Sequence, residues 1–186
     1  TTIDKVKGSY QISFSPESED SIYLALTEDA KDSPSSMWAD SPSNLKDKKN
    51  STDYLIITPK ELKESSNNLA KYREGKGLKS MVVVLEDIYD EFNHGIEDPE
   101  AIKEFISYAY SNYRVAPKYV VLVGEGTYDY KDNLKYSECL IPPIMVNTPH
   151  GLFASDNSFV DVVGDDKVPE MAIGRLPVLT SEELTM

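Results

Sequence analysis

The sequence predicts an α/β domain with a flavodoxin-like parallel sheet and flanking helices, preceded by a short β-hairpin or meander. Short apolar runs rich in β-branched residues, typical of buried strands, occur at residues 54–57, 80–85 and 119–123. Segments with helical spacing of apolar residues separate these runs, and the connections are short. Such β-α-β units form parallel sheets with right-handed crossovers.

Length, composition and charge bound the class of protein. The chain has 186 residues, of which 40% are hydrophobic and 27% charged, so it can bury a sizeable core in one domain, or in one domain plus a fragment. The formal net charge of −13 disfavours nucleic acid and anionic membranes as partners. No apolar run approaches the ~20 residues that span a bilayer. The chain does not begin with a signal peptide. Because the first residue is not methionine, removal of a targeting segment remains an open alternative.

The first 50 residues differ from the rest in composition and in the pattern of apolar residues. Residues 10–14 alternate apolar with polar side chains, and residues 21–26 form a second strand candidate, which predicts a hairpin or meander. Residues 29–50 are rich in Ser, Pro, Asp, Asn and Lys, as linkers are, and Trp38 is expected to anchor this linker by packing. We therefore expect residues 1–50 to be the end of a preceding β domain plus a linker, and residues 51–186 to be the α/β part.

The first helix is predicted directly after the strand at 54–57. Thr58 can cap it, Pro59 suits the first helical position, and Glu61 has capping-box spacing. The helix is expected to run to about Glu74 and to end at Gly75 or Gly77. The side chains expected to face the core are Leu62, Leu69 and Tyr72.

Two further helical segments precede the strand at 119–123. Residues 86–92 predict a short helical turn, and Asp98-Pro99 predicts the cap of a longer helix. In that helix the residues at helical spacing are Ile102, Phe105, Ile106, Ala109, Tyr110 and Tyr113.

The pattern weakens after residue 132. Residues 141–146, 158–163 and 171–173 are strand candidates between polar loops. Thr180 and Glu183 then have capping-box spacing, within one turn of the last residue. A helix that starts at this point leads us to expect that the sequence is part of something longer.

The strand at 119–123 ends in Gly124-Glu125-Gly126, which places polar residues where open α/β sheets usually build their sites. This run lacks the spacing of a phosphate-binding fingerprint. A response-regulator receiver domain is excluded as well, because the strand at 54–57 ends in Thr58-Pro59 rather than in an acidic residue.

Cys139 is the single cysteine, so an internal disulfide framework and a multi-cysteine zinc site are excluded. A nucleophilic cysteine needs a histidine base and an activating environment. His94 and His150 are the two histidines, and none of the three residues lies in a nucleophile-like turn. The sequence therefore favours Cys139 as a half-buried small residue and His94 as a turn residue.

An acidic cluster offers a candidate metal site. Its members are Asp156, Asp161, Asp165, Asp166 and Glu170. Calcium prefers several oxygen ligands on flexible loops, but the spacing is not that of an EF-hand, and a solvated turn explains the cluster equally well. The predicted ligands are Asp156, Asp165 and Asp166.

Several runs occur here in an order and spacing that resemble the amino-terminal half of the gingipain-type cysteine peptidases, family C25. They lie at residues 53–59, 72–78, 98–102, 119–130, 154–157, 164–166 and 172–177, and read DYLIITP, YREGKGL, DPEAI, YVVLVGEGTYDY, ASDN, GDD and AIGRLP. The approach at residues 41–45 is similar to that family's lead-in from a preceding β domain.

The resemblance implies a function that this chain does not carry alone. In that family the catalytic histidine and cysteine come from a second, caspase-like subdomain, so no catalytic residue is transferred to this sequence. The implied protein is a secreted or cell-surface endopeptidase acting on peptide or protein substrates, with calcium as a structural ion. The chain would be its first subdomain, inactive alone, with the downstream catalytic subdomain as partner. The alternative is a binding or scaffolding module that kept the fold without peptidase activity.

Overall fold

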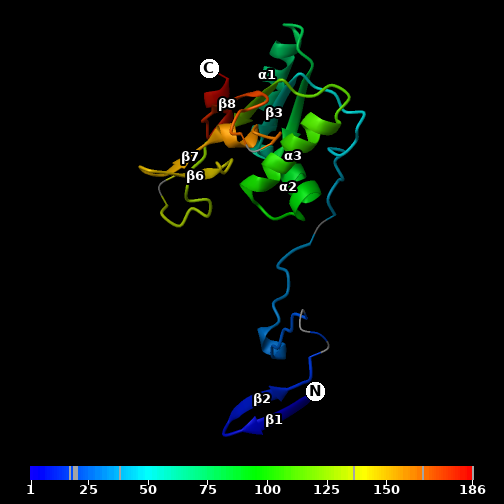
Figure 1. Cartoon of the computed structure of the whole chain (residues 1–186), viewed down its shortest axis with the longest axis vertical. Coiled ribbons are helices and arrows are strands. Elements are labelled where there is room, and N and C mark those ends of the chain that lie inside the picture. Colours follow the sequence, from blue (N-terminus) through cyan, green and yellow to red (C-terminus); the bar gives the residue numbers. More distant parts are fainter. Residues whose placement is uncertain (17, 19–20, 38, 136, 165, 186) are drawn as a thin grey trace. The chain divides into compact units, whose positions relative to one another are not determined.

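The computed structural model describes residues 1–16, 18, 21–37, 39–135, 137–164 and 166–185 (Figure 1). The chain forms two compact units, Thr1–Asp40 and Ser41–Met186. Each is described by itself below. The described part of the chain contains no helix that is both long and apolar enough to cross a membrane.

The first unit contains an antiparallel hairpin of β1 (Thr2–Val6) and β2 (Ser9–Ser13). Lys7 and Gly8 join the strands, with φ of 49° and 88°. Positive φ at both positions is what the tightest hairpin turns require, because their twist then matches that of the strands. The predicted hairpin is confirmed, but its pairing was wrong. The strand at 10–14 pairs with the residues before it, and residues 21–26 are not in a strand.

The remainder of the first unit has little regular structure. A short 3-10 turn, η1 (Glu28–Ala30), follows the hairpin. Large apolar side chains stay exposed, among them Ile3, Tyr10 and Ile22. Trp38, which is predicted to anchor the linker, lies outside the described residues.

The second unit is built on a four-stranded parallel sheet. Its strands are β3 (Tyr54–Thr58), β4 (Ser80–Val84), β5 (Tyr119–Val123) and β8 (Ala172–Leu176), in the order β4-β3-β5-β8. If these four strands are numbered 1 to 4 along the chain, their order in the sheet is 2-1-3-4, the flavodoxin-like arrangement. All five residues of β3 are buried, as the continuous apolar run predicted for a central parallel strand. The predicted fold class is therefore confirmed.

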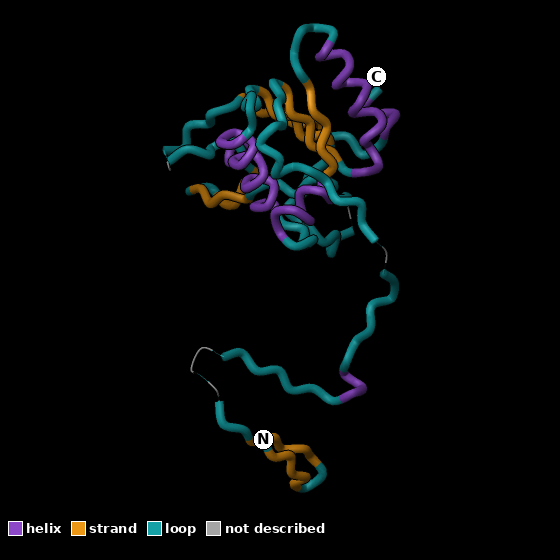
Figure 2. The backbone as a smooth tube through the Cα atoms, turned by 90° about the vertical axis from the view of Figure 1, so that its right-hand side faces the viewer, coloured by secondary structure: helices purple, strands orange, loops and turns teal. Residues whose placement is uncertain are grey.

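Helices cover both faces of this sheet, as Figure 2 shows. Leu55 and Ile57 of β3 pack in the cluster that includes α2 (Leu85–Asn93) and α3 (Pro99–Asn112). The alternate residues Tyr54 and Ile56 pack on the other face, in the cluster that includes α1 (Lys63–Glu74) and Leu184 of α4 (Ser181–Leu184). The strict alternation along β3 divides the core into two layers.

The first helix begins later than predicted. Thr58 is not a cap: it is the buried last residue of β3, and its hydroxyl accepts a hydrogen bond from Ser66. A 3-10 turn, η2 (Lys60–Leu62), precedes α1. Two of the three predicted core residues are confirmed, because Leu62 is buried and Leu69 packs against the same cluster, whereas Tyr72 is 59% exposed. The predicted end at Glu74 is confirmed.

Two other predicted caps are confirmed. Asp98 Oδ1 accepts a hydrogen bond of 2.9 Å from the backbone N–H of Glu100, with Pro99 at the first helical position. At α4, Thr180 and Glu183 form both halves of a capping box. These local pairs need no tertiary contact, which is why sequence spacing suffices to find them.

The region after β5 departs most from prediction. β6 (Met145–Thr148) and β7 (Gly151–Ala154) form an antiparallel hairpin, so the strand expected at 141–146 starts late and pairs outside the main sheet. The strand expected at 158–163 is wrong. Residues 158–160 lie in and directly after a 3-10 turn, η3 (Asp156–Phe159), and Phe159 and Val160 are buried. The candidate at 171–173 falls on β8.

The segment that enters the second unit is fixed by one carboxylate. Glu91 of α2 accepts hydrogen bonds from the backbone N–H groups of Leu45 (2.8 Å) and Lys46 (3.1 Å) and from the Ser43 hydroxyl. Leu45 is buried, and its carbonyl accepts a hydrogen bond from the Tyr113 hydroxyl. Residues 43–46 are thus part of the α/β unit.

Candidate functional site

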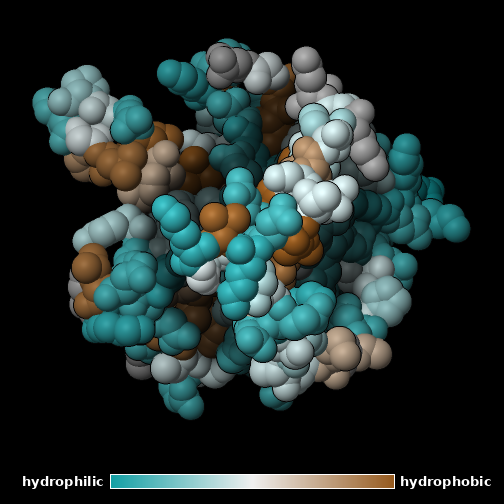
Figure 3. All heavy atoms as spheres, turned by 90° about the horizontal axis from the view of Figure 1, so that it is seen from below, coloured by the Kyte–Doolittle hydropathy of each residue, from teal (hydrophilic) through white to brown (hydrophobic). Residues whose placement is uncertain are grey.

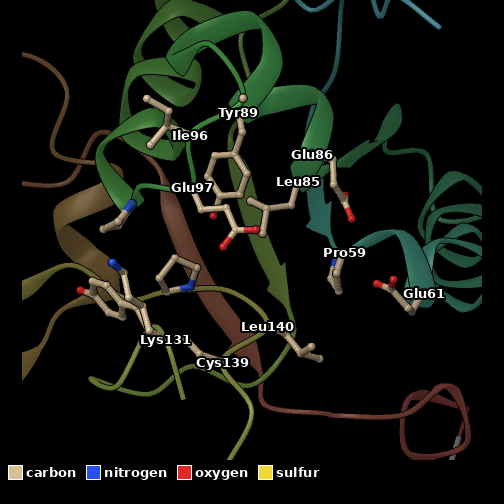
Figure 4. A pocket seen from close by; sticks show the side chains of 14 residues that line it. Pro59, Glu61, Leu85, Glu86, Tyr89, Ile96, Glu97, Lys131, Cys139 and Leu140 are labelled. Atoms are coloured by element: carbon tan, nitrogen blue, oxygen red, sulfur yellow. The ribbon is translucent and has the colours of Figure 1, made fainter. Parts of the chain in front are cut away.

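The carboxyl edge of the sheet holds a candidate site. The chain leaves β3 and β4 toward opposite faces, and such switch points in open α/β sheets form crevices. A cavity of about 540 Å³ lies here (Figure 4). Pro59 after β3, Leu85 after β4 and Leu140 from the loop that follows β5 contribute to its wall. Its volume lies in the range of small-molecule sites.

The cavity combines an apolar wall with a negative rim. Besides Leu85 and Leu140, the side chains of Ile96 and Tyr89 line it. Three acidic residues line the cavity, Glu61, Glu86 and Glu97. Among the lining residues the structure describes, Lys131 is the one basic side chain. Figure 4 shows Tyr89 and Glu97 pointing into the hollow from α2 and from the loop that follows it. Figure 3 shows one face of the molecule, on which hydrophilic residues predominate and hydrophobic ones form smaller groups.

The loop between β5 and residue 141 is closed on itself. The carbonyl of Glu125 accepts hydrogen bonds from the N–H groups of Leu140 (3.0 Å) and Ile141 (2.9 Å). Nearby, the Thr127 N–H donates to the Cys139 sulfur (3.4 Å), and the thiol donates back to the Thr127 carbonyl (3.5 Å). The cysteine thus holds two ends of a loop together.

Asp129 organises the tip of the same loop. Its carboxylate accepts hydrogen bonds from the backbone N–H of Leu134 (2.6 Å) and from the Asn133 side chain (3.1 Å). The backbone bond from Leu134 is the main cause that lowers the pKa of Asp129 below its usual value. The hydrogen bonds of the Asp129 carboxylate therefore stabilise the loop itself.

Arg175 of β8 joins three segments at the carboxyl edge. Its Nε and Nη2 donate to the two oxygens of Asp156 (2.9 and 2.8 Å), while Nη1 donates to the carbonyls of Gly124 (3.0 Å) and Ile141 (2.8 Å). The Arg175 and Asp156 side chains are only 13% and 26% exposed. We call these four residues the Arg175 network. Because bidentate arginine–carboxylate pairs are geometrically specific, it fixes the loop relative to the sheet.

Gly126 makes room for this network. A Cβ atom there would lie 2.6 Å from the Ile141 carbonyl oxygen and 2.8 Å from Arg175 Nη1. Real Cβ atoms do not approach so closely, so the position requires glycine. The third position of the Gly124-Glu125-Gly126 turn thus has a steric requirement for glycine.

The two predicted metal ligands that the structure describes, Asp156 and Asp166, each have a protein partner. Both oxygens of Asp156 bind Arg175, and Asp166 Oδ1 accepts a hydrogen bond from the Val168 N–H (3.0 Å). Asp165 lies outside the described residues. Among those described, no group of three or more His, Cys, Asp or Glu side chains could hold a metal ion. A calcium site at these three positions stays a prediction.

Cys139 is not paired with either histidine. Burial raises the pKa of its thiol, and the groups that act on it are Thr127, Arg175 and Glu125. His94 is the C-cap residue of α2 with φ of 55°, and His150 lies in the turn between β6 and β7. The thiol is half-buried and its hydrogen bonds go to Thr127, and a structural role for Cys139 stays a prediction.

Comparison with known structures defines the class of protein. The chain is similar to the complex of the RgpB pro- and mature domains from Porphyromonas gingivalis (26% identity, TM-score 0.52), covering 70% of this chain and 26% of that one. It also resembles dimeric latent PorU from the same organism (23%, TM-score 0.60, covering 73% and 15%) and the Arg-specific cysteine proteinase gingipain R (24%, TM-score 0.53, covering 78% and 28%). The α/β fold of this chain is thus similar to that of the gingipain structures.

The sequence comparisons give the family. The model for peptidase family C25 matches residues 47–186, and the chain belongs to this family. Gingipain R2 of Porphyromonas gingivalis is 29% identical over 130 residues, which are 70% of this chain. The chain spans only 15% of the length of that relative.

Proposed function

We propose that this chain is the non-catalytic first α/β subdomain of a gingipain-like cysteine endopeptidase, and that its carboxyl edge supports a catalytic subdomain in the same protein. The observation that carries the proposal is the state of Cys139. Membership of family C25 supplies the reaction class, peptide-bond hydrolysis by a cysteine.

A cysteine nucleophile must be a thiolate or stand beside a base that makes it one. Burial raises the pKa of Cys139, and its hydrogen bonds go to the backbone of Thr127. These features favour a neutral thiol at physiological pH. A thiolate, its histidine base and the amides that stabilise the oxyanion would then come from the downstream, caspase-like subdomain.

The role left to this subdomain is mechanical support. In the Arg175 network, two hydrogen bonds hold the loop of residues 124–141 to the sheet, and two more hold Asp156. A catalytic group is held in productive geometry only if its surroundings are themselves fixed by packing and hydrogen bonds. We therefore propose the carboxyl edge as the surface that faces the catalytic subdomain, in a secreted or cell-surface protein that acts on peptides.

A second candidate is a binding or scaffolding module that kept this fold without peptidase chemistry. The cavity at the switch point favours it, since that cavity has the size of a ligand site. The two functions differ in the parent protein: a histidine followed by glycine, and then a cysteine, each after a later strand, belong to the peptidase alone.

Incubation of the purified chain and its Cys139→Ala variant with a protein substrate, followed by mass spectrometry of the products, tests the proposal. We expect no cleavage by either form. Cleavage by the wild-type chain that disappears in Cys139→Ala would overturn it.

A further inference from the structure

One face of the sheet is left open at the amino ends of β5 and β8. On the α3 side these strands are covered, since Val120 is buried and Ile173 packs against the same core. On the α1 side Tyr119 is 43% exposed, and a Cβ atom on Gly174 would have no neighbour within 4 Å. Parallel sheets are ordinarily covered on both faces, so this opening is a place where another molecule can bind.

A cavity of about 430 Å³ occupies the opening, and its volume lies in the range of small-molecule sites. Leu78 and Val121 give it an apolar wall. Tyr54 and Tyr119 add two aromatic rings, whose centroids lie 6.1 Å apart. Among the lining residues that the structure describes, Arg73 of α1 is the one charged side chain. The cavity therefore combines an apolar lining with a single positive group.

The guanidinium group of Arg73 lacks an acidic partner. Within the described residues it makes no ion pair, and its Nε is buried without a hydrogen-bond partner. The chain has 32 acidic residues against 19 basic ones, so the isolation of this cation does not reflect a shortage of acids. Buried polar groups are rarely left unpaired, and because arginine only donates, the missing partner is an acceptor.

The position of the guanidinium selects the type of anion. Its Cζ lies 4.9 Å from the centroid of the Tyr54 ring and 5.8 Å from that of Tyr72. Such cation–π contacts hold the group at the wall of the cavity. Arginine presents its donors in a planar fork, which pairs with a carboxylate through two parallel hydrogen bonds. One cation beside an apolar wall suits a monoanion with an apolar body, whereas a phosphate dianion would stay half-neutralised.

We propose that this cavity binds the anion of a small aliphatic carboxylic acid, with the carboxylate at Arg73 and the alkyl body against Leu78 and Val121. Tyr54, Tyr119 and Ala172, which line it, are the first residues of their strands. The cavity therefore lies at the end of the sheet opposite the carboxyl edge. The inference is independent of the peptidase function proposed above.

Titration of the isotope-labelled chain with isocaproate, followed by the chemical shifts of the backbone amides, tests this proposal. We expect saturable shifts at Tyr119, Val121 and Gly174. Arg73→Gln should weaken binding by about tenfold, the usual cost of a lost hydrogen bond to a charged group. Arg114→Gln removes the same charge from an exposed position outside the cavity and should leave the affinity unchanged. Gly174→Leu places its side chain in the open space and should abolish binding.

Two probes of the same shape test the role of charge in the wild-type chain, where no variant can misfold. The neutral isocaproamide should bind at least about tenfold more weakly than isocaproate, and the cation isohexylamine should not bind. Equal affinities of the acid and its amide, or binding of the amine, would overturn the proposal.

The variants and a peptide supply the remaining outcomes. Equal affinities of Arg73→Gln and Arg114→Gln, unchanged binding to Gly174→Leu, or no saturable shift at the cavity would each overturn the proposal. Tighter binding of the peptide acetyl-Gly-Gly-Leu than of isocaproate would overturn it as well, because the occupant would then be the carboxyl terminus of a peptide rather than a small acid.

Discussion

Replacement of Arg175 by methionine should be the most destabilising single change at the carboxyl edge. The variant keeps an unbranched apolar stem but removes four hydrogen bonds, two of them to Asp156. It leaves a carboxylate that is 26% exposed without its counter-ion. Removal of one partner from a fully buried ion pair costs about 3–5 kcal/mol. Because this pair is partly exposed, we expect a loss of about 2–4 kcal/mol in the free energy of unfolding.

Urea denaturation of the wild-type chain and the Arg175→Met variant, followed by circular dichroism, measures this loss. For a domain of about 150 residues, a loss of 3 kcal/mol corresponds to a decrease of about 6–12 °C in Tm. Lys118→Met is the matched control, since Lys118 pairs with Asp53 through a side chain that is 67% exposed, and such pairs contribute at most about 1 kcal/mol. Arg175→Lys should recover less than half of the loss, because one ammonium cannot replace the planar fork. Equal losses for Arg175→Met and Lys118→Met would refute the reasoning.

Three other substitutions test neighbouring features. Gly126→Ala should lower the free energy of unfolding by more than about 2 kcal/mol, because the added Cβ clashes with the Ile141 carbonyl. Gly174→Ala places its Cβ in open space and should lower it only slightly. Equal losses for the two variants would contradict the steric argument. Asp129→Asn should destabilise the chain at neutral pH and not near pH 2. The pKa of Asp129 in the folded chain lies below its ordinary value of 3.8. Its contribution to stability is therefore full above pH 3.8 and is lost as the pH falls through the folded pKa. Unfolding midpoints of both forms, measured against pH, test this. Glu91→Ala should speed trypsin cleavage within residues 46–49, since its carboxylate holds the preceding turn, and an unchanged rate would show that the turn is held by other contacts.

The central features of the fold follow from local sequence patterns. The strands at β3, β4 and β5 and the caps at Asp98 and Thr180 are set by residues close together in the chain, so periodicity and spacing find them. The start of α1 was predicted too early because the residues after β3 first form a 3-10 turn. The segment around Phe159 was misread as a strand because an apolar run is buried equally well in a turn.

The site was less predictable because it depends on contacts between distant segments. Gly124 and Ile141 meet Arg175 only after β8 has joined the sheet beside β5. One signal was available: Arg175 is a charged residue inside an otherwise apolar strand, and buried charges require partners. Tyr89 gave no signal, because one aromatic residue on a helix is ordinarily part of the core.

The reactivity of Cys139 tests most directly the claim that this chain carries no nucleophile. The rate of its alkylation by iodoacetamide should be measured against pH in the wild-type chain and in the His94→Gln and His150→Gln variants. We predict slow alkylation at neutral pH, a rate that rises only above the ordinary thiol pKa of 9.0, and no effect of either histidine. Fast alkylation near pH 6–7 that is lost in a histidine variant is the sign of a thiolate–imidazolium pair and would contradict the account.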